Sequence, residues 1–282
     1  PSGTMTNQIA VSIHTNRLDE LICEEGSHVY QYETGGYAHN SGIAINLIRG
    51  ENGKITGEQI QRAIKDSYDW LPSSRLVVLE STTNRGGGSY YTLDEIEPIR
   101  KVCNAHGMKL HLDGARLFNA LVETKEDPVE YGKMFDTISI CMSKGLGAPV
   151  GSLLIGKKVD LLRARRLRKV MGGGMRQAGV LAAGCLYALK NNVDRLKVDN
   201  DRAREIGKLL ADKPFVHGVR PVLSNIVIFD LIENLTAETA LQELEKEGIL
   251  ATAFGPNTIR FVTHLDISED DYQRVIGILR RW

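Results

Sequence analysis

Runs of hydrophobic residues alternate with amphipathic segments along this chain, a pattern typical of a mostly parallel α/β sheet with helices between its strands. Thr56 with Gln59 and Thr92 with Glu95 form capping boxes that predict helix starts, and Gly107 suits a helix end. Short runs rich in apolar and β-branched residues predict the strands. These segments are 43–48, 76–80, 108–112, 137–142 and 151–155, and residues 20–23 form a further short apolar run.

After residue 156 the chain is helical, and its last 70 or so residues then have a different pattern. A helical stretch over 157–194 is interrupted by Gly172–Gly174, and each glycine costs a helix about 1 kcal/mol relative to alanine. This run therefore predicts a break between two helices. Further on, strands over 226–230, 249–253 and 258–262 alternate with helices over 237–246 and from Ser268 onwards. We predict two domains, a large α/β domain of residues 1–193 and a small α+β domain of residues 194–282.

Composition narrows the class of protein. The 282 residues include 35 Lys and Arg and 35 Asp and Glu, so a net charge of zero gives no reason to expect nucleic acid or a membrane as partner. The basic run 163–169 is expected to be a solvated helix face or a subunit interface. The four cysteines form neither a zinc nor a disulfide pattern, which predicts a cytoplasmic protein without a metal site. No apolar run has the length of a membrane span.

Two candidate functional residues stand at the ends of predicted strands. Asp113 ends the strand over 108–112, and Lys144 follows the strand over 137–142. The carboxyl ends of parallel strands meet at one edge of a sheet, so these side chains are expected to lie close together. A lysine that forms an imine and an aspartate that keeps a pyridine nitrogen protonated would suit pyridoxal phosphate (PLP). Taken alone, Asp113 is more often an N-cap or ion-pair partner, and Lys144 a solvated turn residue.

A third feature is the sequence Ser2-Gly3-Thr4 at the start of a predicted helix over 4–15. Backbone N–H groups at a helix start bind phosphate, and the two hydroxyl groups add donors. An ordinary N-cap would explain the same residues. His111 lies within an apolar strand and is expected to be packed there.

Six segments carry a pattern known from one family, and they occur in the order of that family. They are Pro1–Met5, Gly26–His28, His111–Asn119, Ser143–Ser152, Gly172–Gly179 and Ile259–His264. Together they resemble the L-threonine aldolase family of fold type I PLP-dependent enzymes. The resemblance implies a fold type I PLP-dependent transferase-like α/β fold, with a mostly parallel seven-stranded sheet, helices on both faces and a small C-terminal α+β domain. It also implies that an N-terminal segment precedes Pro1, and that a protein beginning at Pro1 would have weak or no aldolase activity.

The resemblance implies roles for single residues. Lys144 would be the Schiff-base lysine, Asp113 would pair with the pyridinium nitrogen, and His28 would stack on the cofactor ring and could act as a base. Guanidinium groups grip a carboxylate with two parallel bonds, so two arginines would bind the substrate carboxylate. These are Arg116 and Arg260. The residues that would bind the cofactor phosphate are Ser2, Gly3, Thr4 and Arg176, the last from this or a neighbouring subunit.

One position departs from the family pattern. Where the family carries Thr-His-Asn after the strand over 76–80, this chain has Thr82-Thr83-Asn84. Thr83 therefore stands where a histidine would contact the substrate hydroxyl, and a threonine hydroxyl is no base near neutral pH. We expect Thr83 to hydrogen-bond the substrate, and the base to be His28 or water.

The activity that the resemblance implies is cleavage of L-threonine, L-allo-threonine or a related β-hydroxy amino acid to glycine and an aldehyde. The family's active sites lie between subunits, so a homodimer or homotetramer is expected. Two alternatives stay open, because a fold does not determine the reaction. One is another PLP-dependent reaction of amino acids, such as β-elimination or racemisation, and the other is a truncated, non-catalytic relative.

Overall fold

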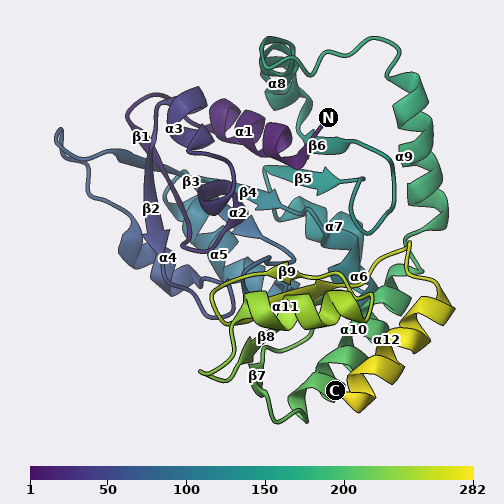
Figure 1. The fold of residues 1–282 in the computed structure, drawn as a ribbon. Coiled ribbons are helices and arrows are strands. Elements are labelled where there is room, and N and C mark those ends of the chain that lie inside the picture. Colours follow the sequence, from purple (N-terminus) through teal and green to yellow (C-terminus); the bar gives the residue numbers. More distant parts are fainter.

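A computed structural model describes residues 1–282, which form two sheets with helices around them (Figure 1). The larger sheet has six strands in the order β2-β1-β3-β4-β5-β6. Its neighbouring strands run parallel except β6, which is antiparallel to β5. The strands are β1 Asp19–Glu24, β2 Ala44–Ile48, β3 Ser73–Glu80, β4 Lys109–Asp113, β5 Thr137–Cys141 and β6 Ser152–Gly156.

The predicted strands all form, and the fold class is confirmed, but the sheet differs from the expectation in its number of strands. It has six strands instead of seven, and the segments that follow β6 in the chain are helices. The last strand also reverses direction. The link over 142–151 contains no helix, and a parallel neighbour would require a longer crossover.

Helices cover both faces of the large sheet. On one face α1 packs across β4, β5 and β6 beside α8, and on the other face α5 packs on β4 with α4 next to it. Alternate residues of β1 show this two-sided burial, because Leu21 packs with Val11 of α1 while Ile22 belongs to the core around Ile96 of α5. The helices are α1 Gly3–His14, α2 His28–Gln31, α3 Gly36–Ser41, α4 Gly57–Ala63, α5 Leu93–Ala105, α6 Leu117–Thr124, α7 Pro128–Lys133, α8 Lys158–Val170 and α9 Gly179–Asn191.

Local sequence signals explain several of these boundaries. Both predicted capping boxes are present, at the starts of α4 and α5. The predicted break at Gly172–Gly174 separates α8 from α9, and Gly172 has a positive φ of 83° that favours glycine. No helix combines the length and hydrophobicity that crossing a bilayer requires.

The C-terminal part forms a second, antiparallel sheet with the order β7-β8-β10-β9. Its core includes Phe229 and Phe261, whose rings meet edge to face at 5.3 Å. The predicted strand over 249–253 shortens to two residues, because the Ile249 N–H bonds to the Leu244 carbonyl at the end of α11. The elements are α10 Leu196–Ala211, β7 Val216–Val219, β8 Ile226–Leu231, α11 Ala237–Lys246, β9 Thr252–Ala253, β10 Thr258–Val262 and α12 Glu269–Arg281.

The helix α10 connects the two parts. Leu196, in its first turn, belongs to the core of the large sheet, whereas Ala203 and Leu210 belong to the core of the small sheet. The cores therefore meet along α10, and the division into residues 1–193 and 194–282 stays a prediction.

The register of the large sheet brings polar residues to one edge. Glu80 pairs with Asp113, and Asp113 pairs with Ser139, so these three residues lie side by side near the carboxyl ends of β3, β4 and β5. Lys144 follows the end of β5. The strand-end positions that the sequence singled out are thus brought together by the pairing of the strands.

Candidate active site

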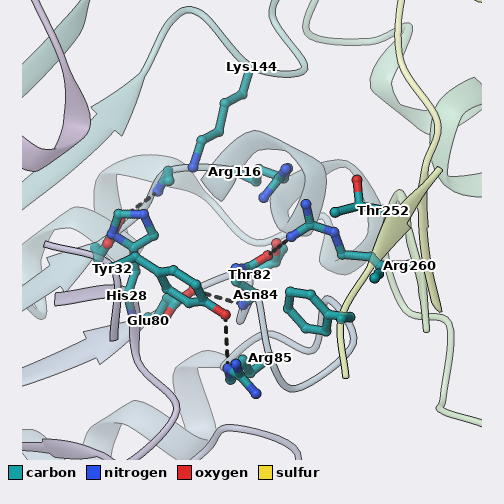
Figure 2. Close-up of a pocket in the computed structure, with 14 residues that line it drawn as sticks. His28, Tyr32, Glu80, Thr82, Asn84, Arg85, Arg116, Lys144, Thr252 and Arg260 are labelled. Atoms are coloured by element: carbon teal, nitrogen blue, oxygen red, sulfur yellow. Dashed lines mark hydrogen bonds between the residues drawn. The ribbon is translucent and has the colours of Figure 1, made fainter. Parts of the chain in front are cut away.

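A cavity of about 540 Å³ opens at this edge of the large sheet, and residues of the small sheet close its other side (Figure 2). It brings together Lys144, Asp113, His28, Arg116 and Arg260, which the sequence assigned to one site. The full lining is His28, Tyr32, Glu80, Thr82, Asn84, Arg85, Asp113, Ala115, Arg116, Lys144, Thr252, Ala253, Phe254 and Arg260. Most of these residues are polar or charged, so the cavity suits a polar, charged ligand.

Lys144 projects into the cavity from the turn that follows β5. Its side chain is half-buried and makes no hydrogen bond or ion pair. The turn needs small residues, because a Cβ atom at Gly145 would come 2.9 Å from Leu196 and 3.0 Å from Asn119. The Lys144 amine is therefore held near the cavity by packing while remaining free to react.

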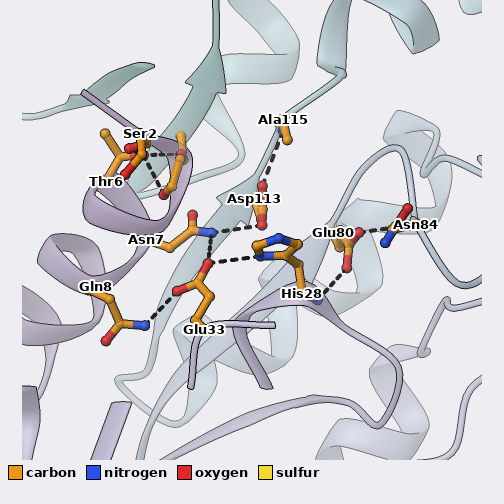
Figure 3. A network of polar contacts seen from close by, with 12 residues as sticks. Ser2, Thr6, Asn7, Gln8, His28, Glu33, Glu80, Asn84, Asp113 and Ala115 are labelled. Carbon is orange, nitrogen blue, oxygen red and sulfur yellow. Dashed lines mark hydrogen bonds and ion pairs between the residues drawn. The ribbon is translucent and has the colours of Figure 1, made fainter. Parts of the chain in front are cut away.

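Asp113 is oriented by a buried polar network (Figure 3). The amide of Asn7, on α1, donates one hydrogen bond to Asp113 Oδ2 and another to Glu33 Oε1, both at 2.8 Å. The Ala115 N–H donates to Asp113 Oδ1 at 3.2 Å. These bonds give the Asp113 carboxylate a defined direction. One comes from α1, which is remote from β4 in the sequence, and the other from the turn directly after β4.

Glu33 also holds the ring of His28. The Nδ1 atom of His28 lies 3.0 Å from Glu33 Oε1, and since an ionised carboxylate only accepts, Nδ1 carries the proton. The hydrogen bond to Glu33 raises the pKa of His28 above its usual value, against the opposing effect of burial. The arrangement leaves Nε2 of the ring for other partners. His111, by contrast, is fully buried, as expected, and burial lowers its pKa to about 4.

Glu80 joins two loops that border the cavity. Its Oε2 accepts the backbone N–H of His28 at 2.8 Å, and its Oε1 accepts that of Asn84 at 2.7 Å. Burial, and then the charge of Asp113, raise the pKa of Glu80 to about 7. Glu80 ends β3 just as Asp113 ends β4, so the same strand-end signal could have identified it in the sequence.

Arg116 and Arg260 lie in the cavity without an acidic partner. Arg260 Nη1 donates to Asn84 Oδ1 at 2.6 Å, and its guanidinium lies 4.7 Å from the centre of the Phe254 ring. The Nε atoms of both arginines are buried without a hydrogen-bond partner. Burial, and then the neighbouring charge of Arg260, lower the pKa of Arg116 to about 10. Two close cations without an acid favour the binding of an anion such as a carboxylate.

The structure does not bring Thr83 to the cavity where it was expected to bind substrate. Its side chain is buried outside the cavity, where Oγ1 donates to the Asn52 carbonyl at 3.2 Å and lies 2.8 Å from Ser89 Oγ. These bonds tie Thr83 to the turn over 51–54, between β2 and α4, and to Ser89 of its own loop. The preceding residue, Thr82, lines the cavity instead.

The residues expected to bind phosphate do not line this cavity. Ser2 is the N-cap of α1, and its Oγ accepts the Met5 N–H at 3.2 Å. Gly3 packs on the end of β5, because a Cβ atom there would lie 2.7 Å from Cys141 Sγ. The start of α1, including Thr4, therefore lies beside the strand that leads to Lys144. Arg176 is exposed in the link between α8 and α9 and does not contribute to the cavity of its own chain.

This set of donors fits PLP. The free amine of Lys144 can bind an aldehyde, and the oriented carboxylate of Asp113 can bind a protonated pyridine nitrogen. The unpartnered Nε atoms of two arginines mark the cavity as prepared for an anionic ligand. The sheet, its strand-end lysine and aspartate, and the small second sheet define a fold type I PLP-dependent enzyme.

Comparisons with known proteins identify the family. Residues 1–234 match the model of the family described as "Beta-eliminating lyase", and the chain belongs to this family. It is 37% identical to low-specificity L-threonine aldolase 1 of Arabidopsis thaliana, with all of this chain and 80% of that protein covered. It is 35% identical to the low specificity L-threonine aldolase of Escherichia coli (strain K12), over 98% of this chain and 80% of the relative.

A comparison with solved structures also leads to threonine aldolases. The chain superposes on the threonine aldolase of Leishmania major with a TM-score of 0.85 and 25% identity, covering 99% of this chain and 82% of the other. The protein is a PLP-dependent lyase.

Sequence reasoning missed several residues that shape the cavity. Asn7 and Glu33 orient Asp113 and His28, and Asn84 contacts Arg260. Nothing in their local sequence distinguishes these polar residues from ordinary surface ones, because their partners lie far away in the chain. The other unpredicted members of the lining are Tyr32, Glu80, Thr82, Arg85, Ala115, Thr252, Ala253 and Phe254.

Proposed function

We propose that the protein cleaves L-threonine, L-allo-threonine or a related β-hydroxy amino acid between Cα and Cβ, giving glycine and an aldehyde. The observation that carries this proposal is the single cavity in which an unpaired lysine, an oriented aspartate and two arginines without an acidic partner come together. Two relatives that cover the whole or nearly the whole chain are named L-threonine aldolases, which supports the same reaction.

The residues of the cavity divide into a cofactor group and a substrate group. When bound, PLP supplies a conjugated ring that accepts the electrons of the broken bond. Lys144 would bind the cofactor aldehyde, Asp113 would keep the ring nitrogen protonated, and His28 would stack on the ring. The backbone N–H groups of Gly3 and Thr4 would bind the phosphate at the positive end of α1.

Arg116 and Arg260 bind the α-carboxylate of the substrate and thereby fix its orientation. The proton of the β-hydroxyl group passes to His28 or to a water molecule that His28 holds. Glu33 supports this role because its hydrogen bond fixes Nδ1 and leaves Nε2 of His28 as the acceptor. Thr83 takes no part, since its hydroxyl is bound elsewhere.

A product assay tests the reaction. We expect the purified protein, supplied with PLP and L-threonine, to release glycine and acetaldehyde in equal amounts. Release of 2-oxobutyrate and ammonia would instead show β-elimination, and formation of the opposite Cα enantiomer would show racemisation. Either result without glycine release would overturn the proposed function.

Replacing Arg260 with methionine is expected to raise KM for L-threonine about 10- to 100-fold, because a charge-assisted, two-bond contact with the carboxylate is lost. The substitution keeps an unbranched apolar side chain and removes the guanidinium group. Steady-state kinetics measure the effect, and Arg75→Met, at a half-exposed site outside the cavity, is the matched control. An unchanged KM in Arg260→Met would show that Arg260 does not bind the substrate carboxylate.

We also propose that the protein is a homodimer or homotetramer that buries the surface of α8 and α9. Exposed apolar side chains concentrate there, which is unusual for a surface facing only water. Arg176 lies in the link between these helices, so it could then reach the phosphate of a neighbouring subunit. The residues are Val159, Leu162, Val170, Met175, Val180, Leu186 and Tyr187, each at least half exposed.

Sedimentation tests the assembly. The protein is expected to sediment as a dimer or tetramer, and the variant Val180→Glu, which places a charge at a position 80% exposed in one chain, is expected to shift it toward smaller species. Leu18→Glu, at an equally exposed leucine of the α1–β1 link, is the control. An active monomer would contradict the proposal.

The compartment is proposed to be the cytoplasm. All four cysteines carry free thiols, and three of them are buried. Free thiols are typical of a reducing compartment, which supports this assignment.

A further inference from the structure

A third arginine in the cavity has no role in the proposed reaction. Arg85 follows Asn84 in the loop after β3 and lines the same cavity as Arg116 and Arg260. It forms no ion pair with any acidic side chain, although it is exposed at the cavity mouth. A monocarboxylic substrate such as threonine uses only the other two arginines, so Arg85 is left without a partner.

The side chain of Arg85 is held in place rather than free in solvent. Its Nε donates to the hydroxyl of Tyr32 at 2.9 Å, and its guanidinium lies 5.7 Å from the Tyr32 ring and 5.2 Å from the Phe254 ring. The Arg85 carbonyl also accepts a hydrogen bond from the side chain of Arg220. Such aromatic contacts restrain a guanidinium and leave its two terminal nitrogens to bind a carboxylate in a bidentate manner.

Arg85 and Arg260 form two separate cationic positions. Phe254 contacts both, at 5.2 Å and 4.7 Å from the respective guanidinium groups. Figure 2 shows Arg85 and Tyr32 on the side of the cavity away from Lys144, with Arg260 on another wall. The Tyr32 ring lies 5.4 Å from the His28 ring, so Arg85 borders the space next to the proposed cofactor and base.

We propose that Arg85 is a specificity-determining residue that binds a second carboxylate, carried on the β-carbon of the substrate. The site then favours β-hydroxy amino diacids, of which β-hydroxyaspartate is the smallest, over threonine. The inference rests on the proposed aldol cleavage, and it names the substrate class of that same site. Two carboxylates on neighbouring carbons would face two cationic positions, Arg260 for the α-carboxylate and Arg85 for the β-carboxylate, and both guanidinium groups lie near the Phe254 ring.

The reaction needs no further reactant. In β-hydroxyaspartate the Cα–Cβ bond breaks, the β-hydroxyl proton passes to the base, and Cα takes up a proton. The products are glycine and glyoxylate, which together contain all atoms of the substrate. The methyl group of threonine, by contrast, offers Arg85 no acceptor, so the guanidinium adds nothing to the binding of threonine.

The experiment compares kcat/KM for β-hydroxyaspartate with kcat/KM for L-threonine. We expect the wild-type protein to prefer the diacid, and Arg85→Gln to lower the ratio of the two values about 10- to 100-fold, as expected for the loss of a charge-assisted bidentate contact. Arg49→Gln is the matched control, because Arg49 is an exposed arginine outside the cavity. In this variant the ratio of the two kcat/KM values is expected to stay at the wild-type value. Tyr32→Phe, which removes the acceptor of Arg85 Nε, is expected to lower the ratio in part.

Binding of an amino diacid that cannot be cleaved gives an independent readout. L-Aspartate lacks the β-hydroxyl group, and we expect it to inhibit threonine cleavage more strongly than L-alanine does, with the difference reduced in Arg85→Gln. Equal inhibition by the two amino acids, or the same substrate ratio in Arg85→Gln and wild type, would overturn the role of Arg85. In that case glycine release from threonine would leave the proposed function standing, whereas a wild-type protein that cleaves neither substrate would overturn the proposed function itself.

Discussion

Replacing Lys144 with alanine is expected to lower the rate of glycine release from L-threonine at least about a thousand-fold, because the protein loses its only covalent link to the cofactor. Lys144 is the one lysine that lines the cavity, and it has no competing hydrogen bond or ion pair. No neighbouring amine can take its place. The folded structure should tolerate the change, since the turn is held by packing around Gly145 and not by the lysine.

Chemical trapping separates this effect from a general loss of structure. Borohydride treatment in the presence of PLP, followed by peptide mass analysis, is expected to place the cofactor on Lys144 in the wild type and on no residue of the cavity in Lys144→Ala. Lys101→Ala, at an exposed position of α5, is the control and should keep both activity and labelling. Cofactor trapped on another lysine of the active wild type would overturn the assignment.

The variant Asp113→Asn is expected to lower kcat about 10²- to 10³-fold, which is the usual cost of removing one oriented electrostatic partner from an active site. Asparagine has nearly the same shape, so the effect would come from the charge. A neutral amide does not hold the pyridine nitrogen protonated, and the ring then accepts electrons less readily. Asp66→Asn, at an exposed site outside the cavity, is the matched control.

The same substitution has a second consequence, at Glu80. The charge of Asp113 helps to raise the pKa of Glu80 to about 7, so its removal is expected to move this pKa toward the ordinary range of a glutamate. A pH titration of the Glu80 carboxyl carbon by NMR, on the cofactor-free protein, measures the shift. A Glu80 pKa that stays near its wild-type value would show that burial alone raises it. An unchanged kcat in Asp113→Asn would show that Asp113 does not act on the cofactor.

Local signals accounted for most elements of the fold. The capping boxes at Thr56 and Thr92 and the glycine run at 172–174 act through nearby backbone, so they are visible in a short window of sequence. The strand runs are readable for the same reason. The direction of β6 depends instead on the link between β5 and β6, which contains no crossover helix. The hydrophobic pattern of β6 does not indicate in which direction the strand runs.

Local sequence signals could not predict in which direction a side chain near the cavity points or which residue it contacts. Thr82 and Thr83 are adjacent and chemically identical, yet Thr82 lines the cavity while Thr83 is tied to Asn52. The network from Asn7 through Glu33 to His28 joins α1 to the loop after α2, and Arg85 meets Phe254 of the small sheet.

By itself the sequence determined the α/β class, the strand ends that carry Asp113 and Lys144, and, through the resemblance of six segments, the PLP-dependent family. These properties depend on periodicity, capping and motifs, which are recorded within a few residues of the chain. Only the tertiary structure decided which hydroxyl faces the cavity, that Glu80 joins the loops of His28 and Asn84, and that Arg85 stands unpaired beside Tyr32. Those outcomes follow from contacts between distant segments, whose geometry is set by the packing of the two sheets together.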